Sequence, residues 1–264
     1  MKSIKSGMTE NQAQAILESE LLKDGAKHTA YGSIVASGKN GAILHYHENN
    51  SKLKNKDLLL IDAGCEWEGY ASDITRTFPV SGKFTSKQKE IYNIVLKTQK
   101  ECIKMIKPGV TMYDIHFTAC RLIQNGLVEL GIIKKLDESD LFDKKAYSIF
   151  FPHGIGHLIG LDVHDVGAKP SKNKKRKAKN LRAQLKLEKD MCITIEPGIY
   201  FIEAYFDSKE HRKKTSSYIN WNIADKYRDV GGIRIEDDLI VTAKGSKNLT
   251  KVPKEINAIE RLMN

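Results

Sequence analysis

Long hydrophobic runs and paired cysteines are both missing from this 264-residue sequence. The longest aliphatic block is LLLI at residues 58–61, which is far too short to cross a bilayer, and the first residues lack the apolar stretch of a signal peptide. These absences predict a soluble, cytoplasmic protein. None of the four cysteines belongs to a CxxC pair, which argues against a zinc site or a disulfide framework and favours reduced structural thiols. The cysteines are Cys65, Cys102, Cys120 and Cys192.

The sequence also lacks a linker rich in proline, glycine or serine, and it lacks a short internal repeat. With 41% hydrophobic and 29% charged residues, the chain is long enough to bury a core of its own. Strands at both ends of a helical middle predict a single α+β domain over the whole chain. Capping residues and helical spacing predict helices within residues 8–26, 85–109 and 111–131. Apolar and β-branched runs predict strands within residues 31–38, 57–64, 66–80, 191–201 and 231–242.

A nucleic-acid-binding surface is not expected, in spite of a net charge of +10. Residues 171–182 carry seven basic residues and no acidic one, and residues 208–217 carry four basic residues and one acidic one. These two segments therefore hold the whole excess of positive charge. No aromatic residue interleaves with their lysines, which favours a pair of solvated loops over a patch for nucleic acid or nuclear import.

The segment FFPHGIGHLIGLDVHDVG at residues 150–167 gathers three histidines among glycines and aliphatic residues. His153 and His157 have the four-residue spacing of the zinc motif HExxH, but the glutamate is missing and the intervening glycines disfavour a helix. The part at residues 158–166, which includes His164, is predicted to be a strand. The segment favours a metal or catalytic site over histidines satisfied within a core.

Acidic residues at the ends of apolar strands supply further candidate ligands. Asp62 ends a strand predicted to be buried, where an unpaired carboxylate is costly. Asp73 follows beyond a turn that can fold it back beside Asp62, and the two carboxylates would repel each other unless a cation lay between them. Glu196 ends another apolar strand, and alternation in the last predicted strand puts Arg234 and Glu236 on one face. Each acid alone would suit an ion pair or a helix cap. Taken together with one histidine, these acidic residues favour a site for a pair of hard divalent ions. Manganese suits such ligands better than cobalt or zinc does.

The chain resembles the catalytic domain of Xaa-Pro dipeptidase (prolidase) and of Xaa-Pro aminopeptidase, from the pita-bread metallopeptidase family, in four segments: IDAGCEWEGYASDITRTFPVSGKFT, FPHGIGHLIGLDVHDVG, TIEPGIYF and GGIRIEDDLIVT. The resemblance runs from about Gly7 to the C-terminus and implies the pita-bread fold, a curved antiparallel sheet flanked by helices. It also implies two divalent ions per chain, most suitably Mn²⁺, with Asp73 and Glu236 bridging them. The implied metal ligands are Asp62, Asp73, His157, Glu196 and Glu236.

The resemblance further implies metal-assisted hydrolysis by an activated water, with no covalent intermediate. Glu196 would both bind metal and handle the proton of the attacking water. His164 and His45 would contact the substrate, and would stabilise the tetrahedral centre or relay protons. His153 would support His157.

The choice between a dipeptidase and an aminopeptidase depends on how the far end of the substrate is held. A dipeptidase binds a free carboxylate directly after the proline, and arginine suits such a planar contact. Arg182 stands at the distance before the TxEPG strand at which prolidases carry an arginine, and Arg234 resembles their second one. The sequence therefore favours hydrolysis of Xaa-Pro dipeptides, with an Xaa-Pro aminopeptidase that acts on longer peptides as the alternative.

The chain departs from the family pattern in two places. The separate N-terminal domain that assists dimerisation in full-length relatives is expected to be absent, which leaves open whether the chain forms a homodimer. Lys189 and Asp190 replace the usual Pro-Gly before the TxEPG strand. Three rivals remain: a methionine aminopeptidase, a noncatalytic pita-bread protein that binds partners or RNA, and a truncated, inactive product. The expected partner is a small peptide with proline at its second position, not a membrane and not nucleic acid.

Overall fold

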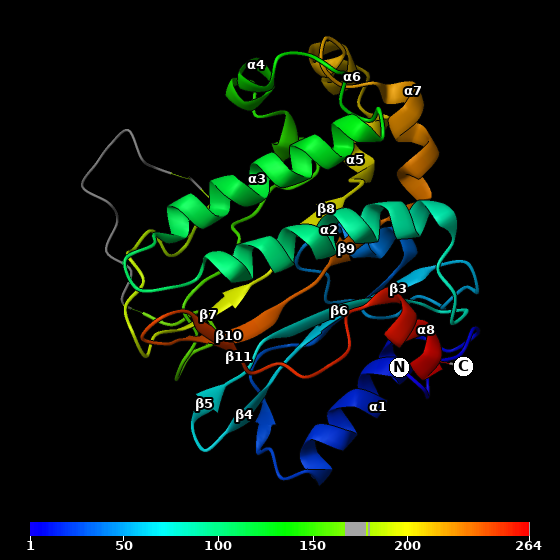
Figure 1. Cartoon of the computed structure of the whole chain (residues 1–264). Coiled ribbons are helices and arrows are strands. Elements are labelled where there is room, and N and C mark those ends of the chain that lie inside the picture. Colours follow the sequence, from blue (N-terminus) through cyan, green and yellow to red (C-terminus); the bar gives the residue numbers. More distant parts are fainter. Residues whose placement is uncertain (167–177, 179, 264) are drawn as a thin grey trace.

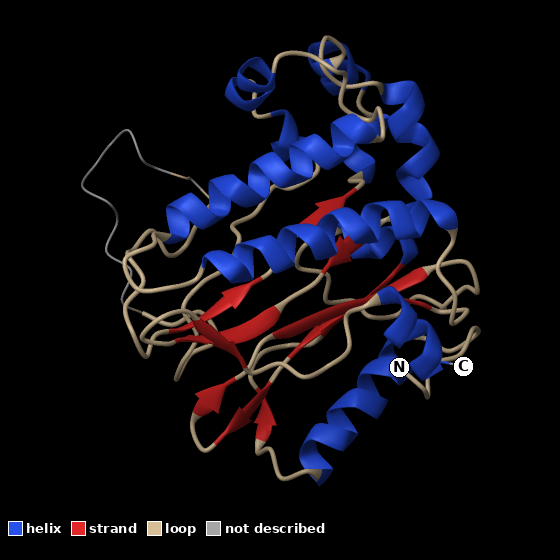
Figure 2. Ribbon diagram, in the orientation of Figure 1, coloured by secondary structure: helices blue, strands red, loops and turns tan. Residues whose placement is uncertain are grey.

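The computed structural model describes residues 1–166, 178 and 180–263 (Figures 1 and 2). The basic segment 171–182 lies mostly outside the described residues, so its loop stays a prediction. The α-helices are α1 (Glu10–Lys23), α2 (Ser86–Met105), α3 (Met112–Glu129), α4 (Glu138–Asp143), α5 (Glu203–Asp207), α6 (Lys209–Thr215), α7 (Trp221–Ala224) and α8 (Ile256–Met263). Short 3₁₀ helices are η1 (Gly38–Ala42), η2 (Ala146–Ile149) and η3 (Asp225–Val230). The strands are β1 (His28–Thr29), β2 (Ile34–Ser37), β3 (Leu58–Ala63), β4 (Cys65–Trp67), β5 (Tyr70–Ala71), β6 (Ile74–Pro79), β7 (Cys192–Ile195), β8 (Gly198–Tyr200), β9 (Gly232–Arg234), β10 (Asp237–Val241) and β11 (Ser246–Asn248).

The strands pair antiparallel in several small sheets. β3 lies between β2 and β6, and Asp62 stands opposite Ile34 on one neighbour and Thr75 on the other. β10 lies between β7 and β11, and β8 pairs with β9. The backbone N–H of Glu236 donates to Thr75 O (3.1 Å), and β9 packs against β3 and β6. The N-terminal and C-terminal strands are therefore joined close to Asp62 and Glu236.

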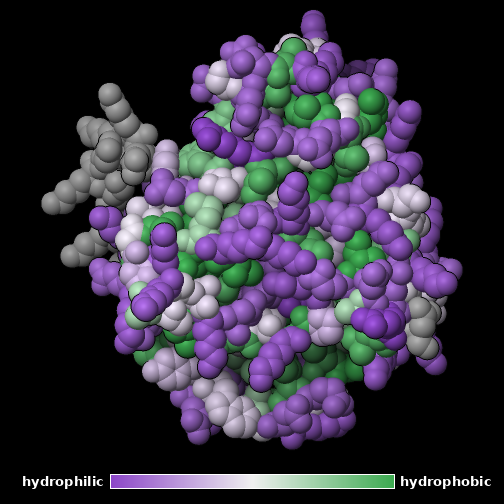
Figure 3. Space-filling model, in the orientation of Figure 1, coloured by the Kyte–Doolittle hydropathy of each residue, from purple (hydrophilic) through white to green (hydrophobic). Residues whose placement is uncertain are grey.

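Helices cover the strands from both sides (Figures 1 and 2). α2 and α3 pack together across one side, where α2 contacts β7, β8 and β9, and α1 lies on the other side against β1 and β2. The main core includes Ile91 and Val95 of α2, Ile123 of α3, Ile193 of β7 and Ile233 of β9, all fully buried. On the face seen in Figure 3, hydrophilic residues cover most of the surface and hydrophobic residues form patches between them.

Threonine residues cap the three long helices. Thr85 accepts a hydrogen bond from the backbone of Gln88, whose side chain accepts one from the backbone of Thr85, so a capping box starts α2. Thr9 caps α1 in the same way, and Thr111 caps α3. The three predicted helices are confirmed, because each signal is local to its own segment.

The predicted strand at residues 158–166 is wrong. Leu158 makes a single bridge to Ile193, and the following residues turn instead of extending. The N–H of Gly160 donates to Asp162 O (3.1 Å) and that of Asp165 donates to Leu158 O (3.0 Å), which closes the turn. Hydrogen bonds within the segment therefore override the strand preference of its branched residues.

The predicted loop at residues 208–217 is also wrong, because it forms helix α6. Ser208 caps this helix by accepting from the backbone of His211 (3.1 Å). Arg212, Lys213 and Lys214 lie in its last turn, where positive charge stabilises a helix. The predicted strands at 191–201 and 231–242 each form two shorter strands, interrupted next to Glu196 and Glu236.

The sequence also makes predictions about membrane-spanning segments and about the state of the cysteines. Within the described part of the chain, no helix is long and apolar enough to span a membrane. All four cysteines are free thiols, which confirms the prediction, and burial raises the pKa of Cys102 to about 12.

Asp190 occupies a backbone conformation that favours glycine. Its φ is +70°, and its N–H donates to Val241 O (2.9 Å) at the turn that precedes β7. This is the position where the family pattern carries glycine, so the substitution places a side chain in the left-handed region. Aspartate is one of the few residues that tolerate this region at modest cost.

We expect Asp190→Gly to stabilise the protein by about 0.5 kcal/mol, because relief of left-handed strain outweighs the greater backbone entropy that glycine loses on folding. The melting temperature should rise by about 1–2 °C in calorimetry. Asp190→Ala is the control, and it should lower the melting temperature because alanine keeps the Cβ without the short polar group. A lower melting temperature for Asp190→Gly would contradict the strain argument.

Candidate metal centre

A pocket of ≈ 780 Å³ contains every residue that the sequence marks as a candidate for metal or substrate binding. It opens between the ends of β3, β7 and β9 and the loops that carry the histidines. Its polar lining includes Tyr31, His45, His47, Asp62, Asp73, His153, His157, His164, Arg182, Glu196, Arg234 and Glu236. The fold thus brings together side chains from distant parts of the sequence.

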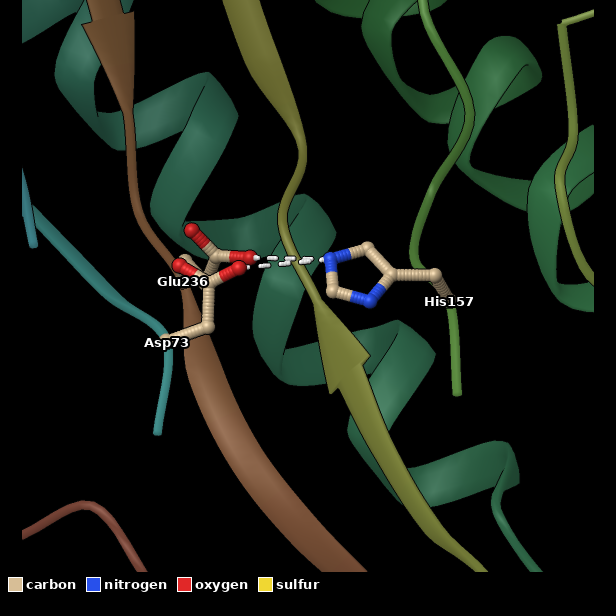
Figure 4. A group of neighbouring side chains, drawn as sticks. All are labelled: Asp73, His157 and Glu236. Atoms are coloured by element: carbon tan, nitrogen blue, oxygen red, sulfur yellow. Dashed lines mark ion pairs between the residues drawn. The ribbon is translucent and has the colours of Figure 1, made fainter. Parts of the chain in front are cut away.

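Three of the predicted metal ligands form a compact group (Figure 4). Asp73 directly precedes β6, Glu236 lies between β9 and β10, and His157 comes from the histidine segment. One ligand atom from each lies within 4.8 Å of the others, and all three residues are buried. His157 Nε2 is 3.4 Å from Asp73 Oδ2 and 3.9 Å from Glu236 Oε1. Figure 4 shows the imidazole pointing at the two carboxylates.

The other two predicted ligands adjoin this group. Glu196 Oε1 lies 3.8 Å from His157 Nε2. Asp62 is linked to Asp73 through the hydroxyl of Tyr31, which lies 2.5 Å from Asp62 Oδ1 and from Asp73 Oδ1. The structure therefore places all five side chains around one space.

Burial and mutual repulsion make this an unfavourable place for so many carboxylates. Burial raises the pKa of Glu196 to about 7, although His157 and Arg234 act in the opposite direction. The pKa values of Glu236 and Asp73 are also raised, first by burial and then by neighbouring carboxylates. A divalent cation would relieve this repulsion, and carboxylate oxygens with one imidazole are ligands that such ions accept. The donor set therefore fits the metal that the family implies.

Arg234 is already engaged with other residues of the site. Its Nη2 donates to Asp62 Oδ2 (2.5 Å) and its Nη1 donates to Tyr200 OH (2.9 Å). The Tyr200 hydroxyl lies 2.8 Å from His153 Nε2, and His153 Nδ1 lies 2.7 Å from Gly154 O. Burial lowers the pKa of His153 to about 3, so the ring is neutral and Nε2 accepts from Tyr200. Arg234 thus holds Asp62, and its predicted contact with substrate stays a prediction.

The remaining predicted residues lie toward the open side of the pocket. The ring of His164 is 4.5 Å from that of His157 in an edge-on arrangement. His45 and Arg182 line the pocket and are exposed. Arg182 has no hydrogen bond or ion pair with another described residue, so its guanidinium is open to a ligand.

Sequence reasoning missed several residues that support the ligands. Tyr31 and Tyr200 contact them as described above, Thr75 Oγ1 donates to Glu236 Oε2 (2.6 Å), and the Asp73 N–H donates to Asp238 Oδ2 (3.0 Å). The sequence gives only a weak signal for Asp238. It lies two residues after Glu236, in a predicted strand where the alternation of polar and apolar residues already accounts for its polar side chain. The sequence gives no signal for Tyr31, because its contact with Asp62 and Asp73 depends on the packing of β2 beside β3.

The sequence and the fold both match those of known proteins. A sequence model of metallopeptidase family M24 matches residues 1–243. A probable Xaa-Pro aminopeptidase of Sordaria macrospora is 42% identical over 264 residues, which cover 100% of this chain and 56% of that protein. A probable Xaa-Pro aminopeptidase of Podospora anserina is 44% identical, over 100% of this chain and 57% of that protein.

Solved structures give the same result. Aminopeptidase P from Escherichia coli with the inhibitor Pro-Leu has a TM-score of 0.84 and 40% identity, and the match covers 99% of this chain and 54% of that one. The zinc-substituted form of the same enzyme with product also has a TM-score of 0.84 and 40% identity, over 99% and 53%. The similarity confirms the predicted pita-bread fold and α+β class. The chain spans about half the length of these relatives.

Proposed function

Because the chain belongs to metallopeptidase family M24, we propose that it removes the N-terminal residue from peptides whose second residue is proline. The observation that carries this proposal is the convergence of the five candidate metal ligands in one pocket, in a chain that aligns along its whole length with probable Xaa-Pro aminopeptidases. The sequence favours a dipeptidase, whereas the names of the relatives favour the aminopeptidase alternative.

A dipeptidase remains the second candidate because of Arg182. Its exposed guanidinium lines the pocket without a partner among the described residues, so it can reach a substrate carboxylate. Arginine presents two parallel N–H donors to such a group. A substrate extended beyond proline has no carboxylate at that position, so the two candidates differ in how much they depend on this residue.

The proposed cofactor is a pair of divalent ions, with Mn²⁺ preferred for a centre rich in carboxylates. Asp62, Asp73, His157, Glu196 and Glu236 would hold it. When bound, such a pair lowers the pKa of a water molecule and polarises the scissile carbonyl.

The protein's own side chains supply the rest of the proposed mechanism. Glu196 accepts the proton of the attacking water and passes it to the leaving proline nitrogen. His164 and His45 donate hydrogen bonds to the substrate carbonyl oxygen as negative charge develops there. The hydrogen bonds from Arg234 and Tyr31 fix the carboxylate of Asp62, so that ligand is oriented before substrate arrives.

The test is peptide hydrolysis by purified protein after chelator treatment, with and without added Mn²⁺. We expect release of the N-terminal residue from Gly-Pro-Xaa and longer peptides only when metal is restored, with Gly-Ala-Xaa peptides as the control. Faster cleavage of Gly-Pro than of longer peptides would favour the dipeptidase. Failure to cleave any of them with Mn²⁺, Co²⁺ or Zn²⁺ would reject the proposal, and tight RNA binding by the inactive protein would favour the noncatalytic alternative.

A further inference from the structure

Another buried carboxylate, that of Glu10, lies outside the metal pocket. It is the first residue of α1 and is 0% exposed. It has no ion pair with another described residue. Instead, its two oxygens accept hydrogen bonds from neutral groups. These are Ser37 N (2.7 Å), Ser37 Oγ (2.7 Å) and Asn40 Nδ2 (3.0 Å) on Oε1, with Tyr46 OH (2.8 Å) and Ser51 N (2.9 Å) on Oε2.

This arrangement is unusual because a buried charge is normally paired with an opposite charge. Here five donors from three segments of the chain surround the carboxylate. The Glu10 N–H also donates to Ser51 O (2.9 Å), so backbone and side chain both bind the same loop. Through these hydrogen bonds, Glu10 holds the end of β2, helix η1 and the segment up to Ser51 close together.

The segment held in this way carries one of the proposed substrate residues. Residues 43–50 contain neither helix nor strand, and His45 within them lines the metal pocket. Most of the segment is exposed, but Tyr46 and Asn49 are each 4% exposed. Asn49, at φ +43°, accepts from Val35 N (3.0 Å) and donates to Ser33 O (2.8 Å). Two buried side chains therefore fix an otherwise irregular loop.

Tyr46 connects this loop to the strands that carry a metal ligand. Its ring packs in a small buried cluster with Ile34 and Ala36 of β2 and Leu60 of β3. Ile34 lies opposite Asp62 in the β2–β3 pairing. The ring therefore sets the distance between the loop and the strand of Asp62, and the hydroxyl, held by Glu10, sets how the loop is oriented.

We propose that Glu10 and Tyr46 form an anchor that positions His45 over the carboxylates of the metal pocket. His45 is exposed and directly precedes Tyr46, and its side chain has no hydrogen bond or ion pair with another described residue. Glu10 and Tyr46 are positioning residues, because neither lines the pocket. This inference rests on the proposed function, since His45 acts on substrate only if the pocket hydrolyses peptides.

The test compares Tyr46→Phe with Ser37→Ala. Each change removes one hydroxyl hydrogen bond to the same buried carboxylate, of nearly equal length, 2.8 and 2.7 Å. Tyr46→Phe also removes the hydrogen bond that the Tyr46 hydroxyl accepts from Asn40 Nδ2 (2.9 Å). Phenylalanine keeps the ring in its cluster, so the fold is retained. Tyr46→Phe should lose somewhat more stability than Ser37→Ala, and only Tyr46→Phe releases the loop that carries His45. Ser37 lies at the opposite end of the network and does not line the metal pocket.

We expect Tyr46→Phe to lower kcat for a Gly-Pro-Xaa peptide about ten-fold while KM changes less than about two-fold, because His45 acts in the transition state. Ser37→Ala should change kcat less than about two-fold. Equal losses of kcat in both variants, or no loss in Tyr46→Phe, would overturn the proposal, because the carboxylate would then have only a structural role.

Hydrogen exchange measured by mass spectrometry provides a second readout that does not depend on activity. Tyr46→Phe should raise amide exchange in residues 43–48 about ten-fold, while Ser37→Ala should leave that segment unchanged. If the wild-type protein cleaves no Xaa-Pro peptide, the proposed function fails and the exchange data alone decide whether the anchor exists. If exchange in residues 43–48 is the same in all three proteins, the anchor is rejected even when peptidase activity is present.

Discussion

Replacing Asp73 with asparagine is expected to lower kcat/KM for a Gly-Pro-Xaa peptide by at least ~1,000-fold, because loss of a proposed metal ligand would remove several kcal/mol of transition-state stabilisation. One ligand atom each of Asp73, His157 and Glu236 lies within 4.8 Å of the others, so Asp73 is part of the compact group that could hold a metal ion. Glu236→Gln should have an effect of similar size. Both variants should also bind Mn²⁺ more weakly in titration calorimetry.

The melting temperature distinguishes a variant that no longer binds metal from a variant that no longer folds. In the metal-free protein, Asp73→Asn removes one of several carboxylates that raise each other's pKa, so its melting temperature should not fall. Added Mn²⁺ should raise the melting temperature of the wild type and not that of the variant, because only binding to the native state stabilises. Asp162→Asn, an exposed change near the pocket, is the control and should behave as the wild type. One tightly held ion that neither site variant disturbs would refute the two-ion proposal.

Replacing Arg182 with alanine is expected to decide between the two proposed reaction classes. If the protein is a dipeptidase, the lost charge-assisted contact is worth about 1.5–3 kcal/mol. The value of kcat/KM for Gly-Pro should then fall about ten- to a hundred-fold, and the preference for dipeptides over tripeptides should narrow. Arg182→Lys should restore only part of the activity, because an ammonium group lacks the paired donors of guanidinium.

If the protein is an aminopeptidase, Arg182→Ala should affect Gly-Pro and Gly-Pro-Xaa alike or affect neither. Lys186→Ala is the matched control, because it removes a nearby exposed charge that does not line the pocket. A similar loss in the control would indicate that general charge, rather than a specific contact, attracts the substrate. Steady-state kinetics at two salt concentrations separate these cases, because salt screens exposed charges.

The sequence alone was sufficient to predict those features that depend on residues close together in the sequence. Helices α1, α2 and α3 form within the predicted ranges, and Thr9, Thr85 and Thr111 cap them, because a cap and the helical spacing of apolar residues act within a few residues of each other. The candidate ligands Asp62 and Glu196 could be found in the same way, because an acid at the end of an apolar strand is costly without a partner. Resemblance to the family then connected them into one expected site.

Only the tertiary structure decided which side chains meet. Residues 158–166 turn over the edge of β7 rather than extend, and Arg234 binds Asp62 rather than standing free. Tyr31 joins Asp62 to Asp73, which lie 31 and 42 residues after it in the sequence. Glu10 holds Tyr46, which lies 36 residues after it. Local preference cannot encode such contacts, because the partners are brought together by strand pairing and burial, and a buried polar group is satisfied by whichever donors the packed chain delivers to it.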